Sequence, residues 1–168
     1  MRLFVAIRFN EGILDALEEL QADLLQGGLR GNYTKAENLH LTLAFIGEYG
    51  DVEAVRDALG DVEFSPFEIS LQGIGRFGNL YWAGIRECDE LEKLVKRIRR
   101  ALADAGIPFD RKKFNPHITL VRKAVYRGQG PLPEVALPDV SMQADHFLLM
   151  NSERGRNGMI YSEIGFFG

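Results

Sequence analysis

The sequence predicts an α+β fold built from a duplicated unit of strands and helices. Strand-like and helix-like segments alternate along the chain with no low-complexity linker. The tetrapeptide His40-Leu41-Thr42-Leu43 recurs 77 residues later as His117-Ile118-Thr119-Leu120, and a helical pattern precedes each copy. We therefore expect one domain over residues 1–168, with two approximate lobes at residues 1–85 and 86–168.

The first half of the chain contains two predicted helices and four predicted strands. Aliphatic side chains recur at helical spacing over residues 13–25, after the candidate cap Asn10, and Gly27-Gly28 ends this helix. The remaining elements are a short helix at residues 51–59 and strands at residues 3–8, 39–46, 67–73 and 80–86, of which the last two form a hairpin.

The second half repeats the order of helix and motif strand. Asp89 with Glu92 is a candidate cap for a helix that buries an aliphatic stripe and ends at Gly106, before Pro108. Strands are expected at residues 118–126, 142–151 and 159–166.

Composition limits the classes of protein to consider. With 168 residues and 46% hydrophobic content, the chain is long enough for one well-buried core. Its single cysteine excludes an internal disulfide and a multi-cysteine metal site, which agrees with a reducing compartment. No apolar run approaches the ~20 residues of a membrane span. We expect a cytoplasmic monomer that does not bind a membrane.

Charge is distributed unevenly along the chain. The net charge is −4, but residues 1–84 carry 6 Lys and Arg against 13 Asp and Glu, whereas residues 85–168 carry 14 against 11. Basic residues near the second motif, at 111–113 and at Arg122, are expected to contact an anion. The basic residues at 96–100 fit a solvated helix face better.

The repeated tetrapeptide is the best indication of function. Side chains alternate along a strand, so His40 and Thr42 share one face, as do His117 and Thr119. Displacement at phosphorus takes a proton from the attacking oxygen and gives one to the leaving oxygen, and two opposed imidazoles meet that demand. Any one histidine is more often a structural residue. That interpretation does not explain why Thr follows at +2 in both copies.

The fuller segments Asn38 to Gly47 and Phe114 to Arg122 resemble the two signature motifs of the two-histidine (2H) phosphoesterases. They are most similar to the RNA 2′,3′-cyclic phosphodiesterase branch, historically called 2′-5′ RNA ligases. The resemblance extends to the closing segment at Gly158 and Tyr161. It implies two pseudo-symmetric lobes, each an antiparallel sheet with helices packed outside, whose His-x-Thr motifs face a central cleft.

The resemblance also implies roles for the motif residues. His40 is the proton donor to the leaving O3′, His117 is the proton acceptor that activates water, and the product is a 2′-phosphate. Thr42, Thr119 and Arg122 would bind the phosphate of an RNA end or a nucleotide. No cofactor is implied, and no metal, because two histidines lack a third ligand at recognisable spacing. Joining of tRNA halves would be the reversal of hydrolysis, without ATP.

Three residues do not follow simply from the two motifs. Arg122 lies five residues after His117, so simple alternation points it to the opposite face unless a bulge redirects it. Tyr33 stands where many relatives carry a tryptophan, an exchange that keeps an aromatic surface for a base. His146 has no Thr at +2 and is expected to be a structural or surface residue.

Two other functions fit the same residues. A module without activity could capture RNA ends or nucleotides in the cleft. A related enzyme could act on small cyclic phosphates, such as ADP-ribose 1″,2″-cyclic phosphate, or on 2′-5′ oligonucleotides. The residues that wall the pocket determine which of these substrates binds, and the sequence does not show where those residues lie.

Overall fold

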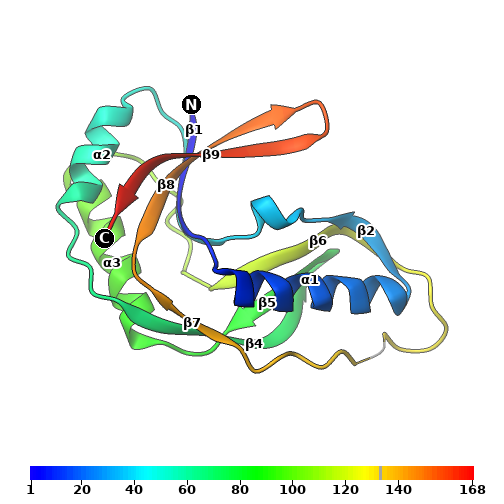
Figure 1. Cartoon of the computed structure of the whole chain (residues 1–168). Helices are drawn as coiled ribbons and strands as arrows, with labels where there is room; N and C mark the ends of the chain where they lie inside the picture. Colours follow the sequence, from blue (N-terminus) through cyan, green and yellow to red (C-terminus); the bar gives the residue numbers. More distant parts are fainter. Residues whose placement is uncertain (133) are drawn as a thin grey trace.

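A computed structural model describes residues 1–132 and 134–168 of the chain, which form nine strands, three α-helices and one short 3₁₀ helix within these ranges (Figure 1). In chain order the elements are β1 (Arg2–Ile7), α1 (Glu11–Gln26), β2 (Leu29–Tyr33), η1 (Ala36–Asn38), β3 (Leu41–Glu48), α2 (Val52–Gly60), β4 (Phe67–Phe77), β5 (Leu80–Ile85), α3 (Asp89–Asp104), β6 (His117–Tyr126), β7 (Ser141–Ala144), β8 (Phe147–Gly155) and β9 (Gly158–Phe167).

The strands form two antiparallel sheets, which confirms the predicted fold class. One sheet has the order β3-β1-β8-β9 and carries the first motif at β3. The other has the order β2-β6-β5-β4-β7 and carries the second motif on β6. Each sheet takes strands from both ends of the chain. The sheets therefore do not correspond to residues 1–85 and 86–168, because β8 and β9 complete the first sheet and β2 joins the second.

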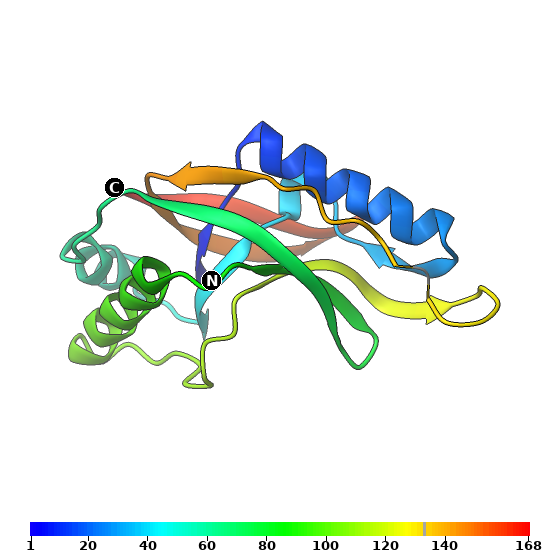
Figure 2. The same cartoon turned by 90° about the horizontal axis from the view of Figure 1, so that it is seen from below.

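Helices cover the outer faces of both sheets. Helix α1 packs on β2, β6 and β7 of the second sheet, whereas α2 and α3 pack together and contact β9 and β3 of the first (Figure 2). Strand β1 is buried from Leu3 to Ile7. Leu3, Val5 and Ile7 belong to the main core. Phe4 and Ala6 point to the opposite face, where they form a small apolar cluster with two residues of β8. Burying both faces fixes β1 as an inner strand.

Most predicted elements are present, and the structure differs from the prediction in several places. Strand β2 was not predicted, and the strand expected at residues 142–151 is two strands, β7 and β8, in different sheets. The first motif strand begins at Leu41, so His40 lies just before it. The Asn10 side chain caps α1 as predicted, by accepting a hydrogen bond from the Ile13 amide. Cys88 rather than Asp89 occupies the cap position of α3, and its side chain does not cap the helix amides.

No helix in the described ranges is long and apolar enough to cross a membrane.

A single methyl group at Gly31 should weaken the pairing of β2 with β6. A Cβ at this position would lie 2.8 Å from the Arg122 carbonyl oxygen and 3.0 Å from the Ala124 Cα, both of them backbone atoms that cannot yield easily. We expect Gly31→Ala to lower the free energy of unfolding by about 1–3 kcal/mol in urea titrations. The matched control is Gly60→Ala, where no atom lies within 4 Å of the added Cβ. Equal stability of the two variants would contradict the close approach.

Candidate active site

The first motif holds His40 by both ring nitrogens. Nδ1 lies 2.7 Å from the Asn38 carbonyl oxygen and Nε2 lies 2.9 Å from the Thr42 hydroxyl. A carbonyl can only accept, so Nδ1 carries the hydrogen and donates it. Nε2 of the neutral ring then accepts from the Thr42 hydroxyl. The nitrogen available for chemistry is therefore Nε2, with Thr42 already oriented toward it.

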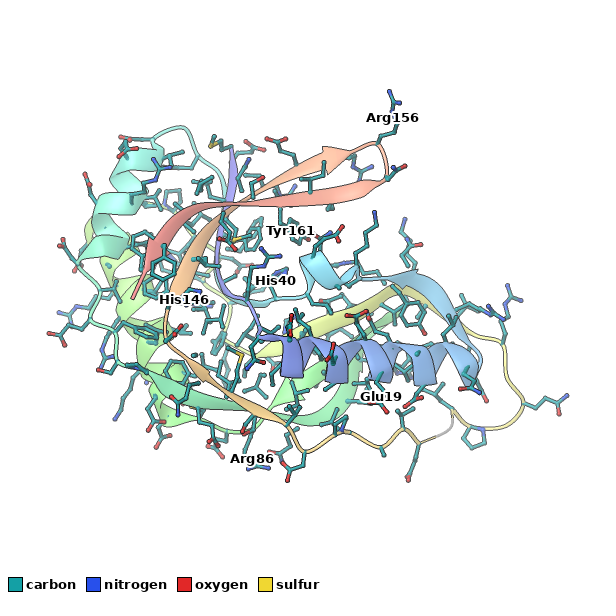
Figure 3. The ribbon with its side chains drawn as sticks, in the orientation of Figure 1. Glu19, His40, Arg86, His146, Arg156 and Tyr161 are labelled. Carbon is teal, nitrogen blue, oxygen red and sulfur yellow. The ribbon has the colours of Figure 1, made fainter. Side chains whose placement is uncertain are left out.

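His40 lies on the small apolar cluster of the first sheet. Its ring centroid is 5.0 Å from that of Phe4 and 5.2 Å from that of Tyr161, which meets the imidazole edge-on. Figure 3 shows Tyr161 beside His40. Burial among these rings lowers the pKa of His40 below its ordinary value of 6.5, and the positive charges of Arg122 and Arg8 lower the pKa further, although the hydrogen bond to Asn38 opposes both. The imidazole is therefore mostly neutral in the unliganded protein at neutral pH.

The second motif holds His117 in the same way. It is the first residue of β6, and its Nδ1 donates to the Asn115 carbonyl oxygen at 2.7 Å. Each histidine thus bonds through Nδ1 to the carbonyl of an asparagine two residues before it, which leaves Nε2 as the nitrogen that can exchange a proton. The sequence repeat is therefore Asn-x-His-x-Thr, which begins two positions before the histidine.

The aromatic neighbours of His117 come from the β4–β5 hairpin. The ring of Phe77 lies edge-on at 5.2 Å between centroids, and that of Trp82 lies 6.2 Å away. Phe77 is 45% exposed, so this flank of His117 opens to solvent, in contrast to the enclosed ring of His40.

A bulge in β6 brings Arg122 to the motif face. Two neighbouring residues of β5 pair with Thr119 and Val121, so Leu120 is an extra residue on β6. The strand changes phase at this point, and Leu120 and Val121 are both buried. Arg122 consequently lines a cavity together with Thr119, and simple alternation from His117 gives the wrong face.

That cavity lies between the two sheets and has a volume of about 680 Å³. Of the five predicted site residues, His40, Thr119 and Arg122 line it. Thr42 and His117 are not among its lining residues. Thr42 is bonded to His40, and His117 shares the Thr119 face of β6, close enough for its charge to affect the pKa of His40.

Several cavity residues were not predicted as site residues from the sequence. They are polar, cationic or aromatic, and come mainly from η1, β2 and the β8–β9 turn: Asn32, Tyr33, Lys35, Asn38, Lys123, Arg154, Asn157 and Tyr161. Tyr33 does lie at the site, as the resemblance implies. The repeated Asn before each motif histidine was a usable signal for Asn38. The resemblance had already included Tyr161 of β9, but its place at the site follows only from the pairing of β9 with β8.

The third histidine lies apart from the site. His146 bonds to the Asp145 carboxylate at 2.6 Å and stacks on Phe166 with 4.4 Å between ring centroids. It lies between β7 and β8 and is not among the residues that line the cavity. The prediction that His146 has a structural role agrees with these contacts.

Two imidazoles held in the same way through Nδ1, each with a threonine two residues further on, beside a cavity between two antiparallel sheets, form the arrangement expected of a two-histidine phosphoesterase. The chain belongs to the 2′-5′ RNA ligase superfamily, which it matches over residues 10–156. The resemblance inferred from the two motifs is thereby confirmed.

Similar proteins match over nearly the whole chain. An RNA 2′,3′-cyclic phosphodiesterase of Archaeoglobus fulgidus is 32% identical, covering 99% of each chain. One of Methanothermobacter thermautotrophicus is 30% identical, covering 99% of this chain and 98% of the relative. The crystal structure of Escherichia coli LigT complexed with 3′-AMP superposes with a TM-score of 0.83 at 28% identity, covering 98% of this chain and 95% of that one.

The ionisation of His40 should be visible in both spectra and stability. We expect its imidazole to titrate below pH 6.5 in NMR spectra, because burial disfavours the charged form. The unfolded chain then binds a proton more readily than the folded one. The stabilisation is therefore fully present above the unfolded pKa and is lost as the pH falls through the folded pKa. Relative to His40→Gln, wild-type stability should fall as the pH drops from above 6.5 through the lowered pKa of folded His40. Titration of His40 above 6.5 would contradict the assigned burial.

Proposed function

We propose that this protein hydrolyses terminal 2′,3′-cyclic phosphates of RNA to 2′-phosphates by acid–base catalysis with His40 and His117. The observation that carries the proposal is the shared arrangement of the two histidines, each fixed through Nδ1, which leaves Nε2 as the nitrogen that can exchange a proton with the substrate. The names of the relatives, which are RNA 2′,3′-cyclic phosphodiesterases, support the substrate class.

Hydrolysis needs one proton removed and one delivered. His117 Nε2 takes a proton from water as the water oxygen bonds to phosphorus, and His40 Nε2 gives a proton to O3′ as the P–O3′ bond breaks. The 2′-phosphate remains on the ribose and the histidines exchange protonation states. Each transfer typically contributes ~10²- to 10⁴-fold to the rate. The assignment of His40 as donor and His117 as acceptor follows the family resemblance.

Protonation of His40 changes what Thr42 can do. In the neutral ring Nε2 accepts the Thr42 hydroxyl hydrogen at 2.9 Å. A protonated Nε2 no longer accepts, so the Thr42 hydroxyl is free to donate to a non-bridging phosphate oxygen. Protonation of His40 Nε2 therefore has two effects. It makes His40 a general acid, and it frees the Thr42 hydroxyl to donate to the phosphate.

The substrate itself supplies the condition for protonation. Burial lowers the pKa of His40 in the free protein. A phosphate anion bound beside the ring favours the imidazolium and counteracts this effect. Arg122 and the Thr119 hydroxyl, which line the same cavity, would hold the non-bridging oxygens while charge develops on them.

The same chemistry accounts for ligation. When a 5′-hydroxyl of a second RNA replaces water, His117 takes its proton and O3′ leaves as before. The product is a 2′-5′ phosphodiester, and the strain of the cyclic phosphate replaces ATP as the source of energy.

Removal of either motif histidine should abolish turnover without unfolding the protein. We expect His40→Ala and His117→Ala each to slow hydrolysis of an RNA ending in a 2′,3′-cyclic phosphate by more than ~10². Chromatography of the products should show a 2′-phosphate, and EDTA should leave the rate unchanged.

His146→Ala is the matched control and should keep the wild-type rate, because His146 bonds only to its neighbour Asp145. If the wild type binds such RNA but never hydrolyses it, the protein is a capture module. If it turns over only ADP-ribose 1″,2″-cyclic phosphate or 2′-5′ oligonucleotides, the substrate class is wrong.

A further inference from the structure

The cavity beside His40 carries more positive charge than one phosphate requires. Lys35, Arg122, Lys123 and Arg154 line it, and its lining residues include no Asp or Glu. Within residues 1–132 and 134–168, no carboxylate lies within 4.0 Å of the charged groups of these four side chains. The whole chain carries a net charge of −4, so this concentration of cations does not follow from overall composition. It points to a polyanionic ligand.

These cations extend beyond the reach of one phosphate. The Lys35 amine donates to the Asn157 carbonyl oxygen at 2.9 Å, at the turn before β9. Tyr161, which contacts His40, lies three residues into β9 from Gly158. Three residues of a strand span about 10 Å. Lys35 therefore contacts the start of β9 about three strand residues away from the tyrosine that packs on His40.

Lys123 lines the cavity with its backbone in an unfavourable conformation. Lys123 has φ of 51° and is the one non-glycine residue of positive φ in the described ranges. In a regular strand Arg122 and Lys123 would point to opposite faces. Here both line the cavity, and a second bulge in β6, opposite Gly31, accommodates the extra residue. Such strain persists where the surrounding structure enforces it, and often at functional positions.

The β8–β9 turn is also anchored next to the site. The Asn38 amide donates to the Met159 carbonyl oxygen at 2.9 Å, in addition to the bond from Lys35 to Asn157. These bonds join η1 to the start of β9 and keep Arg154, on β8, at the cavity. Arg156 projects from the tip of the same hairpin, away from His40 and Tyr161 (Figure 3).

We propose that Lys35, Lys123 and Arg154 bind the internucleotide phosphates that precede the cyclic phosphate, so that the site prefers RNA chains to mononucleotides. The inference rests on the proposed phosphodiesterase function and adds the course of the RNA. The cyclic phosphate lies at His40, Thr119 and Arg122, and the preceding nucleotides run between η1 and the β8–β9 turn. A compact 5′-polyphosphate on a single nucleotide fits less well, because the cations are spread along the cavity.

The experiment compares three substrates with the same terminal base. They are a nucleoside 2′,3′-cyclic phosphate, the same nucleotide with a 5′-triphosphate, and a trinucleotide ending in the cyclic phosphate. The variants are Lys35→Gln, Lys123→Asn and Arg154→Gln, all at exposed positions, with Arg156→Gln as the matched control. For the wild type and each variant, kcat/KM is measured on each of the three substrates.

The wild type should prefer the trinucleotide. Each variant should lose about two- to fivefold on the trinucleotide, and the Lys35→Gln/Arg154→Gln double variant should lose about the product of the two single effects. Losses on the mononucleotide should be much smaller, and Arg156→Gln should match the wild type on all substrates. Equal losses on the mononucleotide and the trinucleotide would assign these cations to the reacting phosphate. A triphosphate as good as the trinucleotide would assign them to a nucleoside polyphosphate.

A binding measurement separates this inference from the proposed function. Affinity for a trinucleotide ending in a 2′-phosphate is followed by fluorescence anisotropy against salt concentration. Each variant should reduce the slope of log affinity against log salt by up to about 0.7, the value for one complete phosphate contact on a single strand. If the slopes change but no substrate is hydrolysed, the proposed function fails and the RNA path stands. If the mononucleotide is hydrolysed and the slopes do not change, the RNA path fails alone.

Discussion

The geometry of the site depends on two bulges in β6, because a regular strand would divide the phosphate-binding groups between two faces. The first bulge, at Leu120, turns Arg122 toward the motif face, and the second places Lys123 beside it. The Leu120 carbonyl accepts two hydrogen bonds, from the buried Gln21 side chain of α1 at 2.9 Å and from the Thr34 amide at 2.9 Å. Helix α1 thus supports the irregular strand through a buried polar contact, which a bulge in the middle of a sheet requires.

The two histidines have the same backbone setting and different surroundings. Both donate Nδ1–H to the carbonyl two residues before them, which fixes the same tautomer in each. His40 lies against Phe4 and Tyr161 over a buried apolar cluster, and its pKa is lowered by that burial. His117 lies beside the exposed Phe77. A reaction that needs an acid and a base from identical side chains is served by such a difference in environment.

Local signals in the sequence predict most of the fold and the centre of the site. The Asn10 cap, the helical periodicity before Gly27 and the repeated His-x-Thr all depend on neighbours along the chain. Strand β2 could not be predicted, since Arg30, Gly31 and Asn32 lack strand patterning and pair only because β6 lies beside them. The exchange of strands between the halves, and with it the positions of Arg154 and Tyr161, depends on long-range pairing that periodicity does not encode.

The division of labour between the histidines is tested most directly with a substrate in which sulfur replaces O3′ of the cyclic phosphate. A thiolate leaves without a proton, because thiols have a pKa near ~8.5, far below that of an alcohol. Loss of the general acid is therefore harmless with this substrate, whereas loss of the base is not. The account predicts that His40→Ala regains most of the wild-type rate and that His117→Ala stays slow. Recovery of His117→Ala instead would reverse the roles, and recovery of neither would contradict general-acid catalysis by a histidine.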